Sequence, residues 1–326
     1  MGTQAPWLDL HAHPVADLGG GDPLASQPGD HDLIAALSAA QAAGMTAVTV
    51  STVADLRVLS PDPDRGLRAT RSFLPGEAYE DHERQLDGIA RLLAATGTEV
   101  AATAADIDSA YRNGQTAVLV NCEGGDFIEG KLDRLAEARA AGVSSLTLVH
   151  YRVNSIGDVQ TERPAHCGLS QFGQDVVAEC NALGIVIDCA HATFETTVGV
   201  LGHSNHPVMV SRSQLDHADQ HHPRLISAEH ARAVAGCGGL IGARPSAITC
   251  SSLSDFIDEV MRLVDLVGID HVAVGTDMDA DFRPVMHSYG DFAALPELLA
   301  SRGLSDGEID KILGTNALDL LRAVTG

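Results

Sequence analysis

The sequence predicts a parallel (β/α)8 barrel, the TIM-barrel architecture, over its 326 residues. Short apolar runs alternate with segments of helical periodicity from residue 7 to residue 276, which indicates a parallel sheet with helical crossovers. Eight or nine strands over this length fit a closed barrel better than an open, doubly wound sheet. The sequence also lacks the G-x-G-x-x-G and P-loop motifs of nucleotide-binding sheets.

The individual elements follow from local patterns. Strands are expected at the β-rich apolar runs 7–11, 45–51, 99–103, 117–123, 145–150, 185–190, 207–211, 239–243 and 271–276. Helices are expected at 31–43, 78–96, 131–141, 169–183, 227–236 and 253–267. Glycine follows several of these helices, where a left-handed residue often ends a helix: Gly44, Gly97, Gly142, Gly184 and Gly268. We expect one domain over 1–326, with an excursion at about 53–76 and C-terminal helices at about 304–326.

Composition and charge exclude several classes of partner. The formal net charge of −23 disfavours nucleic acids and anionic membranes, because their phosphates would be repelled. No apolar run approaches the roughly 20 residues of a membrane span, and neither a signal-peptide pattern nor a lipid-anchor tail is present. The six cysteines form no C-x-x-C pair, which is typical of reduced thiols. We therefore expect a cytoplasmic protein.

Ionisable residues gather at the C-terminal ends of the predicted strands. His11 and His13 end the first strand, and because residues i and i+2 of a strand point to the same side, both imidazoles can reach one ion. Five later strands end in Glu123, His150, His191, Arg212 and Asp277. Barrel enzymes work at this face, and such a buried cluster is costly unless its members are paired or bind a metal. The pattern therefore predicts a metal site.

Several of these residues also have a purely structural interpretation. Glu123 could cap the turn that follows its strand, and His150 could be a hydrogen-bonded core residue. Asp188 lies inside a strand, so we expect it to support the structure around the site. Three histidines share a loop with two aspartates, which favours a solvated acidic loop over a second metal site: His217, His221 and His222.

The sequence resembles the membrane dipeptidase (renal-type) family of the amidohydrolase superfamily from Asp9 to about Ala323. The resemblance rests on the segments 121–125, 146–150, 168–173, 181–191 and 270–279. It implies a hydrolase in which a zinc-activated water cleaves dipeptides, with D-residues accepted at the C-terminal position. It also implies metal ligands at His11, His13, Glu123, His191 and Asp277. Asp277 would be the catalytic acid and base, His150 would stabilise the oxyanion, and Arg224 would hold the substrate carboxylate.

Two residues depart from the family pattern. His13 stands where the family usually has aspartate, which keeps a ligand at this position. Arg212 stands where the family motif has a histidine ligand of a second metal. Because a guanidinium cannot coordinate a cation, we expect one Zn²⁺ or another divalent ion rather than two. Arg212 is then available to bind the substrate.

Three functions stay open on this basis. The first is a metal-dependent hydrolase that cleaves the amide bond of dipeptides. The second is a superfamily enzyme that acts on another small carboxylate-bearing amide, such as an acyl-amino acid, or on a lactone. The third is a metal-poor binding protein without peptidase activity. In each case the expected partner is a small molecule, neither nucleic acid nor membrane is expected, and a homodimer is an open alternative.

Overall fold

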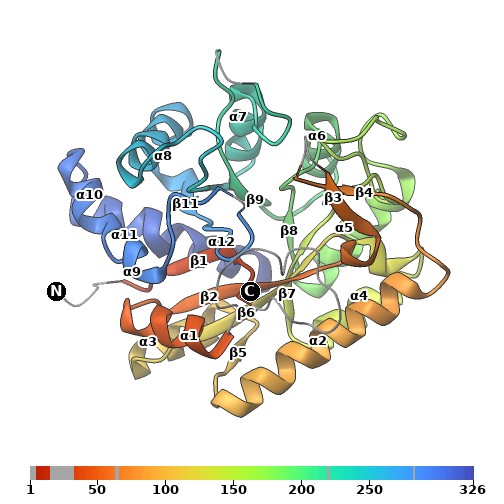
Figure 1. The fold of residues 1–326 in the computed structure, drawn as a ribbon, viewed down its shortest axis with the longest axis horizontal. Coiled ribbons are helices and arrows are strands. Elements are labelled where there is room, and N and C mark those ends of the chain that lie inside the picture. The colour runs from red at the N-terminus through yellow and green to blue at the C-terminus, as the bar shows by residue number, and fades with distance from the viewer. Residues whose placement is uncertain (1–4, 15–32, 63–65, 219–220, 282) are drawn as a thin grey trace.

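The computed structural model describes residues 5–14, 33–62, 66–218, 221–281 and 283–326. Eight parallel strands form a barrel in the order β1-β2-β6-β7-β8-β9-β10-β11, with helices packed around it (Figure 1). The strands are β1 (Leu8–Ala12), β2 (Ala47–Val53), β6 (Ala117–Glu123), β7 (Val143–Thr147), β8 (Val186–Asp188), β9 (Met209–Ser213), β10 (Leu240–Ala243) and β11 (Val272–Val274). The predicted (β/α)8 barrel is confirmed.

The barrel closes through backbone contacts just beyond its first and last strands. The amide of His13 donates to the carbonyl of Met278 at 2.8 Å, and the amide of Asp277 donates to the carbonyl of His11 at 2.9 Å. Ala12 and Met278 also form a parallel bridge. Closure at this point makes the histidines of β1 neighbours of Asp277, although they lie at opposite ends of the chain.

The predicted strand at 99–103 is not part of the barrel. It forms only the short β5 (Val100–Ala101), which pairs with β6 outside the barrel order. The predicted helices are present as α1 (Leu33–Ala42), α2 (Glu77–Thr96), α4 (Asp133–Ala140), α5 (Gln171–Leu183), α7 (Ala228–Gly236) and α8 (Leu253–Val267). Positions 31 and 32 of the first predicted helix lie outside the described residues. The glycines predicted to end helices all have positive φ angles.

Two further helices are α3 (Ala104–Asn113) and α6 (Phe194–Leu201), and the sequence patterns used above do not predict them. Each begins at a threonine whose side chain accepts a hydrogen bond from a backbone amide of the first turn. Thr103 accepts from the amide of Asp106, and Thr193 accepts from the amide of Thr196. Capping of this kind is a helix-start signal that a search for apolar periodicity overlooks.

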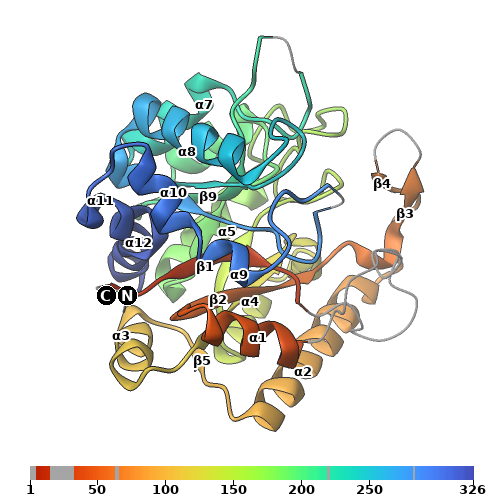
Figure 2. The ribbon, with the colours of Figure 1, turned by 60° about the vertical axis from the view of Figure 1, so that its left-hand side comes forward.

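The segment after β2 leaves the barrel, as the Pro-, Asp- and Arg-rich composition of 53–76 predicts. It contains the 3-10 turn η1 (Leu56–Val58) and an antiparallel hairpin of β3 (Leu59–Asp62) and β4 (Gly66–Ala69), which projects from the barrel (Figure 2). Residues 63–65 of this excursion lie outside the described residues. Later short turns are η2 (Asp126–Ile128) and η3 (Ile269–His271).

The C-terminal part of the chain is helical and packs against one end of the barrel. It contains α9 (Tyr289–Phe292), α10 (Leu295–Ser301), α11 (Asp306–Asp310), a π-helical turn (Lys311–Thr315) and α12 (Asn316–Thr325). Leu318 and Leu321 of α12 share a buried cluster with residues that begin six strands: Leu8, Ala47, Ala117, Val186, Met209 and Leu240. Because α12 packs at the N-terminal ends of the strands, the polar C-terminal ends face the other way.

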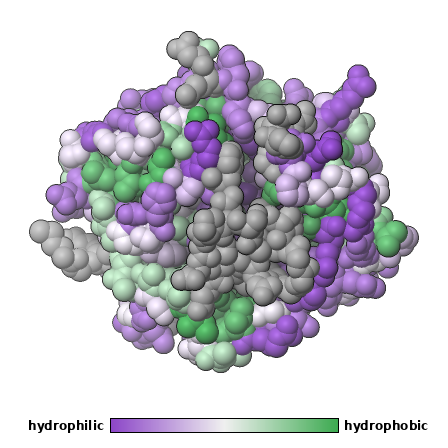
Figure 3. Space-filling view, in the orientation of Figure 1, coloured by the Kyte–Doolittle hydropathy of each residue, from purple (hydrophilic) through white to green (hydrophobic). Residues whose placement is uncertain are grey.

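Hydrophilic residues cover most of the described part of the face in Figure 3, with hydrophobic residues in smaller groups. In the described ranges, none of the helices combines the length and the apolarity that crossing a membrane requires.

Candidate active site

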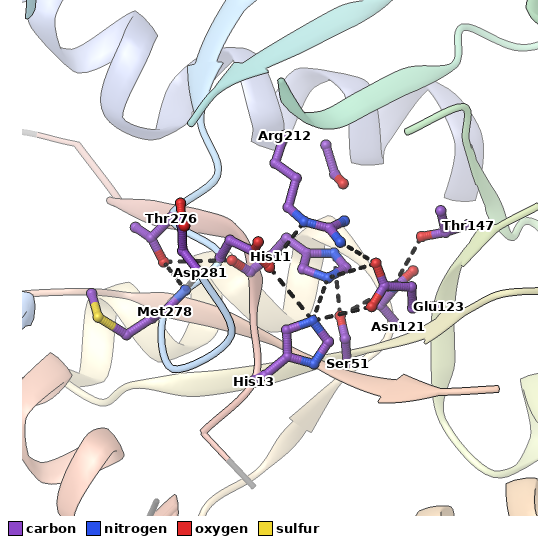
Figure 4. A network of polar contacts seen from close by, with 12 residues as sticks. His11, His13, Ser51, Asn121, Glu123, Thr147, Arg212, Thr276, Met278 and Asp281 are labelled. Atoms are coloured by element: carbon purple, nitrogen blue, oxygen red, sulfur yellow. Dashed lines mark hydrogen bonds and ion pairs between the residues drawn. The ribbon is translucent and has the colours of Figure 1, made fainter. Parts of the chain in front are cut away.

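Polar side chains from separate strand ends converge at one mouth of the barrel. They line a pocket of about 60 Å³, and the predicted residues that line it are His13, Glu123, His150, His191, Arg212, Arg224 and Asp277. The remaining lining residues are Tyr151, His222, Arg244, Ile248 and Ala280. His11 is fully buried next to His13, and Figure 4 shows both imidazoles turned toward Glu123. The structure thus brings together all the residues that the sequence analysis assigned to a site.

Possible metal-ligand atoms of four side chains gather at the end of β1. Nε2 of His13 lies 3.0 Å from Nε2 of His11, 3.1 Å from Oε2 of Glu123 and 3.6 Å from Oδ1 of Asp277. Nε2 of His11 lies 3.8 Å from Oε1 of Glu123. A tetrahedral ion with bonds of about 2.0–2.1 Å would place its ligand atoms about 3.3–3.4 Å apart. The separations among His11, His13 and Glu123 bracket this value, so these three side chains fit one divalent ion, and Asp277 beside His13 is a candidate fourth ligand.

The protonation states of these groups also suit a cation. Burial and the nearby Arg212 lower the pKa of His11 to about 4, so its imidazole is neutral near pH 7. Burial alone would raise the pKa of Glu123, but Arg212 and His150 outweigh it and hold the pKa well below its usual range. Oε2 of Glu123 and Oδ1 of Asp277 are buried without a hydrogen-bond partner among the described residues. Arg212 faces Oδ1 of Asp277 at 2.9 Å, whereas Oε2 of Glu123 faces the imidazole of His13 at 3.1 Å, so a cation beside Oε2 would offset the cost of its burial.

A second cluster surrounds the other oxygen of Glu123. Oε1 of Glu123 lies 3.2 Å from Nε2 of His191 and 3.3 Å from Nε2 of His150. Here, however, Nη2 of Arg212 makes a close contact with the same oxygen (Figure 4). Nε of Arg212 lies 2.9 Å from Oδ1 of Asp277. The guanidinium therefore lies where an ion held by Glu123, His150 and His191 would lie. Its fixed positive charge disfavours a cation there.

Arg244 is a member of the site that the sequence analysis missed. Its Nη2 lies 2.8 Å from Oδ2 of Asp277, and its Nε lies 3.1 Å from Oδ2 of Asp281. Arg212 and Arg244 together hold the pKa of Asp277 below its usual range, although burial acts in the opposite direction. Arg244 follows β10 directly, so the rule that singled out the other strand ends also applies to it.

Asp55 is a second member that was missed. Its Oδ1 lies 2.8 Å from Nδ1 of His150, and its Oδ2 accepts a hydrogen bond from the amide of Tyr151 at 2.8 Å. With the Nδ1 proton donated to Asp55, Nε2 of His150 faces Glu123 and the pocket. Asp55 is fully buried two residues after β2, where the sequence analysis saw only the start of an excursion.

Arg224 lines the pocket and has one nitrogen without a hydrogen-bond partner among the described residues. Its Cζ lies 4.2 Å from the centre of the Tyr151 ring, and its Nη1 is in close contact with Nδ1 of His191. Its Nη2 is buried without a hydrogen-bond partner among the described residues. A buried guanidinium with a free donor fits an anionic ligand, and a carboxylate matches its geometry best.

The remaining polar residues have structural roles. Asp188 accepts hydrogen bonds from the hydroxyls of Thr147 and Ser211 at 2.6 and 2.7 Å, and it thereby ties β7 and β9 to β8, as its position within a strand predicted. His221 is exposed beside Asp216, and His217 lies 3.5 Å from Glu259. Neither belongs to the groups of possible metal ligands found among the described residues.

The backbone is strained at the site. His191 has a φ angle of 67°, Asp277 one of 53° and Asp279 one of 68°, all in the left-handed region that residues other than glycine rarely adopt. The backbone also approaches β9 closely, because a Cβ at Gly242 of β10 or at Gly275, just after β11, would lie 1.8 or 2.0 Å from the carbonyl oxygen of Ser211. Such strain is typical of functional sites.

The pocket adjoins a larger groove. The groove measures about 480 Å³ and shares Tyr151, His222 and Arg224 with the pocket. Residues 67–69 of the β3–β4 hairpin form one wall, and residues 160–162 form another. Together the two spaces offer room for a small molecule that reaches from the pocket past Arg224.

The comparisons with known protein sequences identify one family. The model of the membrane dipeptidase family (peptidase family M19) matches residues 3–326. Among curated proteins, dipeptidase verJ of Clonostachys rogersoniana is 28% identical over 277 residues, which cover 81% of this chain and 70% of the relative. Dipeptidase tcpJ of Claviceps purpurea is also 28% identical, over 76% of this chain. The match spans 60% of that relative, less than two thirds of its length.

Solved structures show the same fold. The dipeptidase AC, a metallopeptidase of family M19, superposes with a TM-score of 0.82 at 20% identity and covers 99% of both chains. A metallopeptidase from Rhodobacter sphaeroides, solved with a phosphinate mimic of the dipeptide L-Ala-D-Ala, has a TM-score of 0.80 at 20% identity. This match covers 98% of the present chain and 99% of the other.

Proposed function

The chain belongs to the membrane dipeptidase family, peptidase family M19, and we propose that it is a metal-dependent hydrolase that cleaves dipeptides. The observation that carries the proposal is the group of His11, His13 and Glu123 with Asp277 beside it, next to a guanidinium on Arg224 whose Nη2 has no partner among the described residues. The first group fits a metal ion, and the second fits the carboxylate that every dipeptide carries. The names of the curated relatives support the same activity.

The proposed cofactor is one Zn²⁺, held by His11, His13, Glu123 and Asp277. A bound divalent ion supplies a water molecule whose pKa is lowered toward about 7. The carboxylate of Asp277 lines the pocket beside His13, and in this proposal it accepts a proton from the water. The same carboxyl group then passes the proton to the leaving amine.

The proposed substrate is a dipeptide whose carboxylate pairs with Arg224. A bidentate contact at this point would select molecules with a free carboxylate near the scissile bond over longer peptides. The Rhodobacter sphaeroides relative bound to a mimic of L-Ala-D-Ala supports a D-residue at the C-terminal position. The groove beyond Arg224 would receive the side chain of that residue.

The direct test is hydrolysis of L-Ala-D-Ala, L-Ala-L-Ala and an acyl-D-alanine by the zinc-loaded protein, with a chelator-treated sample beside it. The proposal expects cleavage of at least one dipeptide, which stops when the metal is removed and resumes when zinc is restored. Cleavage of the acyl-amino acid alone would favour the second function above, an enzyme for another carboxylate-bearing amide. Binding of these compounds without turnover in a zinc-loaded sample would contradict the proposal.

We expect one tightly held zinc ion per chain, and a second ion in the variant Arg212→His. The substitution removes the positive charge beside Glu123 and adds a neutral nitrogen where Glu123, His150 and His191 already converge. Elemental analysis of both proteins after dialysis against trace zinc measures the stoichiometry. Two equivalents in the unmodified protein would contradict the expectation.

Asp55→Asn should lower kcat/KM for a dipeptide by about 10- to 100-fold, the usual range for a residue that orients an active-site histidine. The amide cannot accept the Nδ1 proton of His150 as a carboxylate does, so the ring loses its fixed tautomer and orientation. Steady-state kinetics measure the effect. Asp81→Asn is a matched control, because Asp81 is also buried and pairs with arginines outside the pocket. Equal losses in the two variants would mean that Asp55 has only a structural role.

A further inference from the structure

One nitrogen of the Arg212 guanidinium, Nη1, has no hydrogen-bond partner among the described residues. Its Nη2 contacts Glu123 and its Nε lies 2.9 Å from Asp277, whereas its Nη1 is buried without a hydrogen-bond partner among the described residues. The side chain is only 3% exposed, and it lines the pocket. A buried N–H without a partner carries a desolvation penalty, so its free nitrogen is best explained by an acceptor on a ligand.

We propose that Arg212 is a catalytic residue that takes the electrostatic role of a second metal ion. Its Nη1 donates to the oxygen of the scissile carbonyl as this oxygen becomes an anion. The inference rests on the proposed function, because it concerns the same hydrolysis at the same site. It assigns to Arg212 a contact with the reacting group, rather than with the substrate carboxylate at Arg224.

During the reaction a negative charge develops on the carbonyl oxygen, and Nη1 of Arg212 could stabilise this charge. The oxygen of water bonds to the carbonyl carbon, the carbonyl π pair moves to its oxygen, and the proton of water passes to Asp277. When the C–N bond breaks, its electron pair leaves with the nitrogen, which takes the proton from Asp277, and the oxygen pair re-forms the C=O bond. The carbonyl oxygen is thus anionic only between the two events, when Arg212 would act.

Arg212 suits this task better than its neighbour His150. A guanidinium is always charged and has only donors. Both ring nitrogens of His150 already face carboxylates, because Nδ1 lies 2.8 Å from Oδ1 of Asp55 and Nε2 lies 3.3 Å from Oε1 of Glu123. Two carboxylates also hold Arg212 in place before the substrate arrives, and donors that need no reorganisation give the largest stabilisation of an oxyanion.

The test compares two ligands by calorimetry on the zinc-loaded protein and on Arg212→Gln. The phosphinate mimic of L-Ala-D-Ala carries a tetrahedral anionic group, whereas D-alanine carries only the carboxylate that Arg224 binds. Arg212→Gln should weaken phosphinate binding by about 100- to 1000-fold, the loss typical of one oxyanion donor. Its affinity for D-alanine should be nearly unchanged, as should its zinc content. Equal losses for both ligands, or an unchanged phosphinate affinity, would overturn the proposal.

Three further variants keep the test decisive. Arg212→Lys retains the charge if Arg212→Gln does not fold, and it should show a smaller loss that is still selective for the phosphinate. Arg212→His with a second zinc ion should regain phosphinate affinity, because the positive charge of the ion would replace that of the guanidinium beside the anionic group. Arg134→Gln changes another buried arginine, which contacts Phe127 and Glu129 instead of the pocket, and it should bind both ligands normally. An unmodified protein that binds the phosphinate no better than D-alanine would overturn the proposed function itself.

Discussion

Replacing Glu123 with glutamine should lower kcat/KM for a dipeptide by at least about 1000-fold, or about 4 kcal/mol of transition-state stabilisation. Glu123 is the one residue that both clusters share: its Oε2 faces His13, and its Oε1 faces His191 and Arg212. An amide at this position removes the negative charge and turns an NH₂ group toward either the histidine or the guanidinium. The variant should therefore lose zinc as well as activity, which elemental analysis and steady-state kinetics measure.

Stability needs a separate measurement in this variant. Removing one partner of a buried ion pair costs about 3–5 kcal/mol, although Arg212 keeps its contact with Asp277. Glu129→Gln makes the same chemical change at a carboxylate paired with Arg134, six residues further along the chain and outside the pocket. The control should keep its zinc and its activity. A Glu123→Gln protein with normal zinc content and normal turnover would leave Glu123 as a structural cap.

Most of the barrel could be predicted from the sequence because each element carries its own signal. The strand predicted at 117–123 coincides with β6, and the helix predicted at 253–267 coincides with α8. The run at 99–103 contains the strand β5, but an apolar run does not reveal whether its strand pairs inside the barrel or beside it. Only the pairing of Val100 with Val118, which is a tertiary contact, places β5 outside the barrel.

The sequence predicted which residues form the site, but it did not predict which of their side chains contact one another. The strand-end pattern brought His11, His191 and Asp277 into one hypothesis, and the structure places them around one pocket or directly beneath it. The sequence does not reveal that Arg212 lies between Glu123 and Asp277, because that arrangement depends on the close approach of β9, β10 and β11. Arg244 directly follows the strand predicted at 239–243, so the same pattern of ionisable residues at strand ends could have identified it.

Asp277→Asn should lower kcat by about 100- to 10,000-fold, the range that general acid–base catalysis contributes, with little change in KM. Asparagine has nearly the shape of aspartate and tolerates the left-handed backbone at this position, where φ is 53°. The substitution therefore removes proton transfer with little disturbance of the backbone. Single-turnover and steady-state kinetics on the zinc-loaded variant separate the loss in chemistry from a loss in binding.

Asp279→Asn is the matched control, because it makes the same change at a residue with a φ angle of 68° that does not line the pocket. The zinc content of Asp277→Asn then distinguishes the role of Asp277 as a metal ligand from its role as a proton acceptor. His11, His13 and Glu123 supply three of the four donors, so an ion should remain in Asp277→Asn, although more weakly held. A variant that keeps its ion and its substrate affinity but loses kcat would assign proton transfer to Asp277. Loss of the ion in step with activity would instead make Asp277 a metal ligand alone, and the proton would need another acceptor.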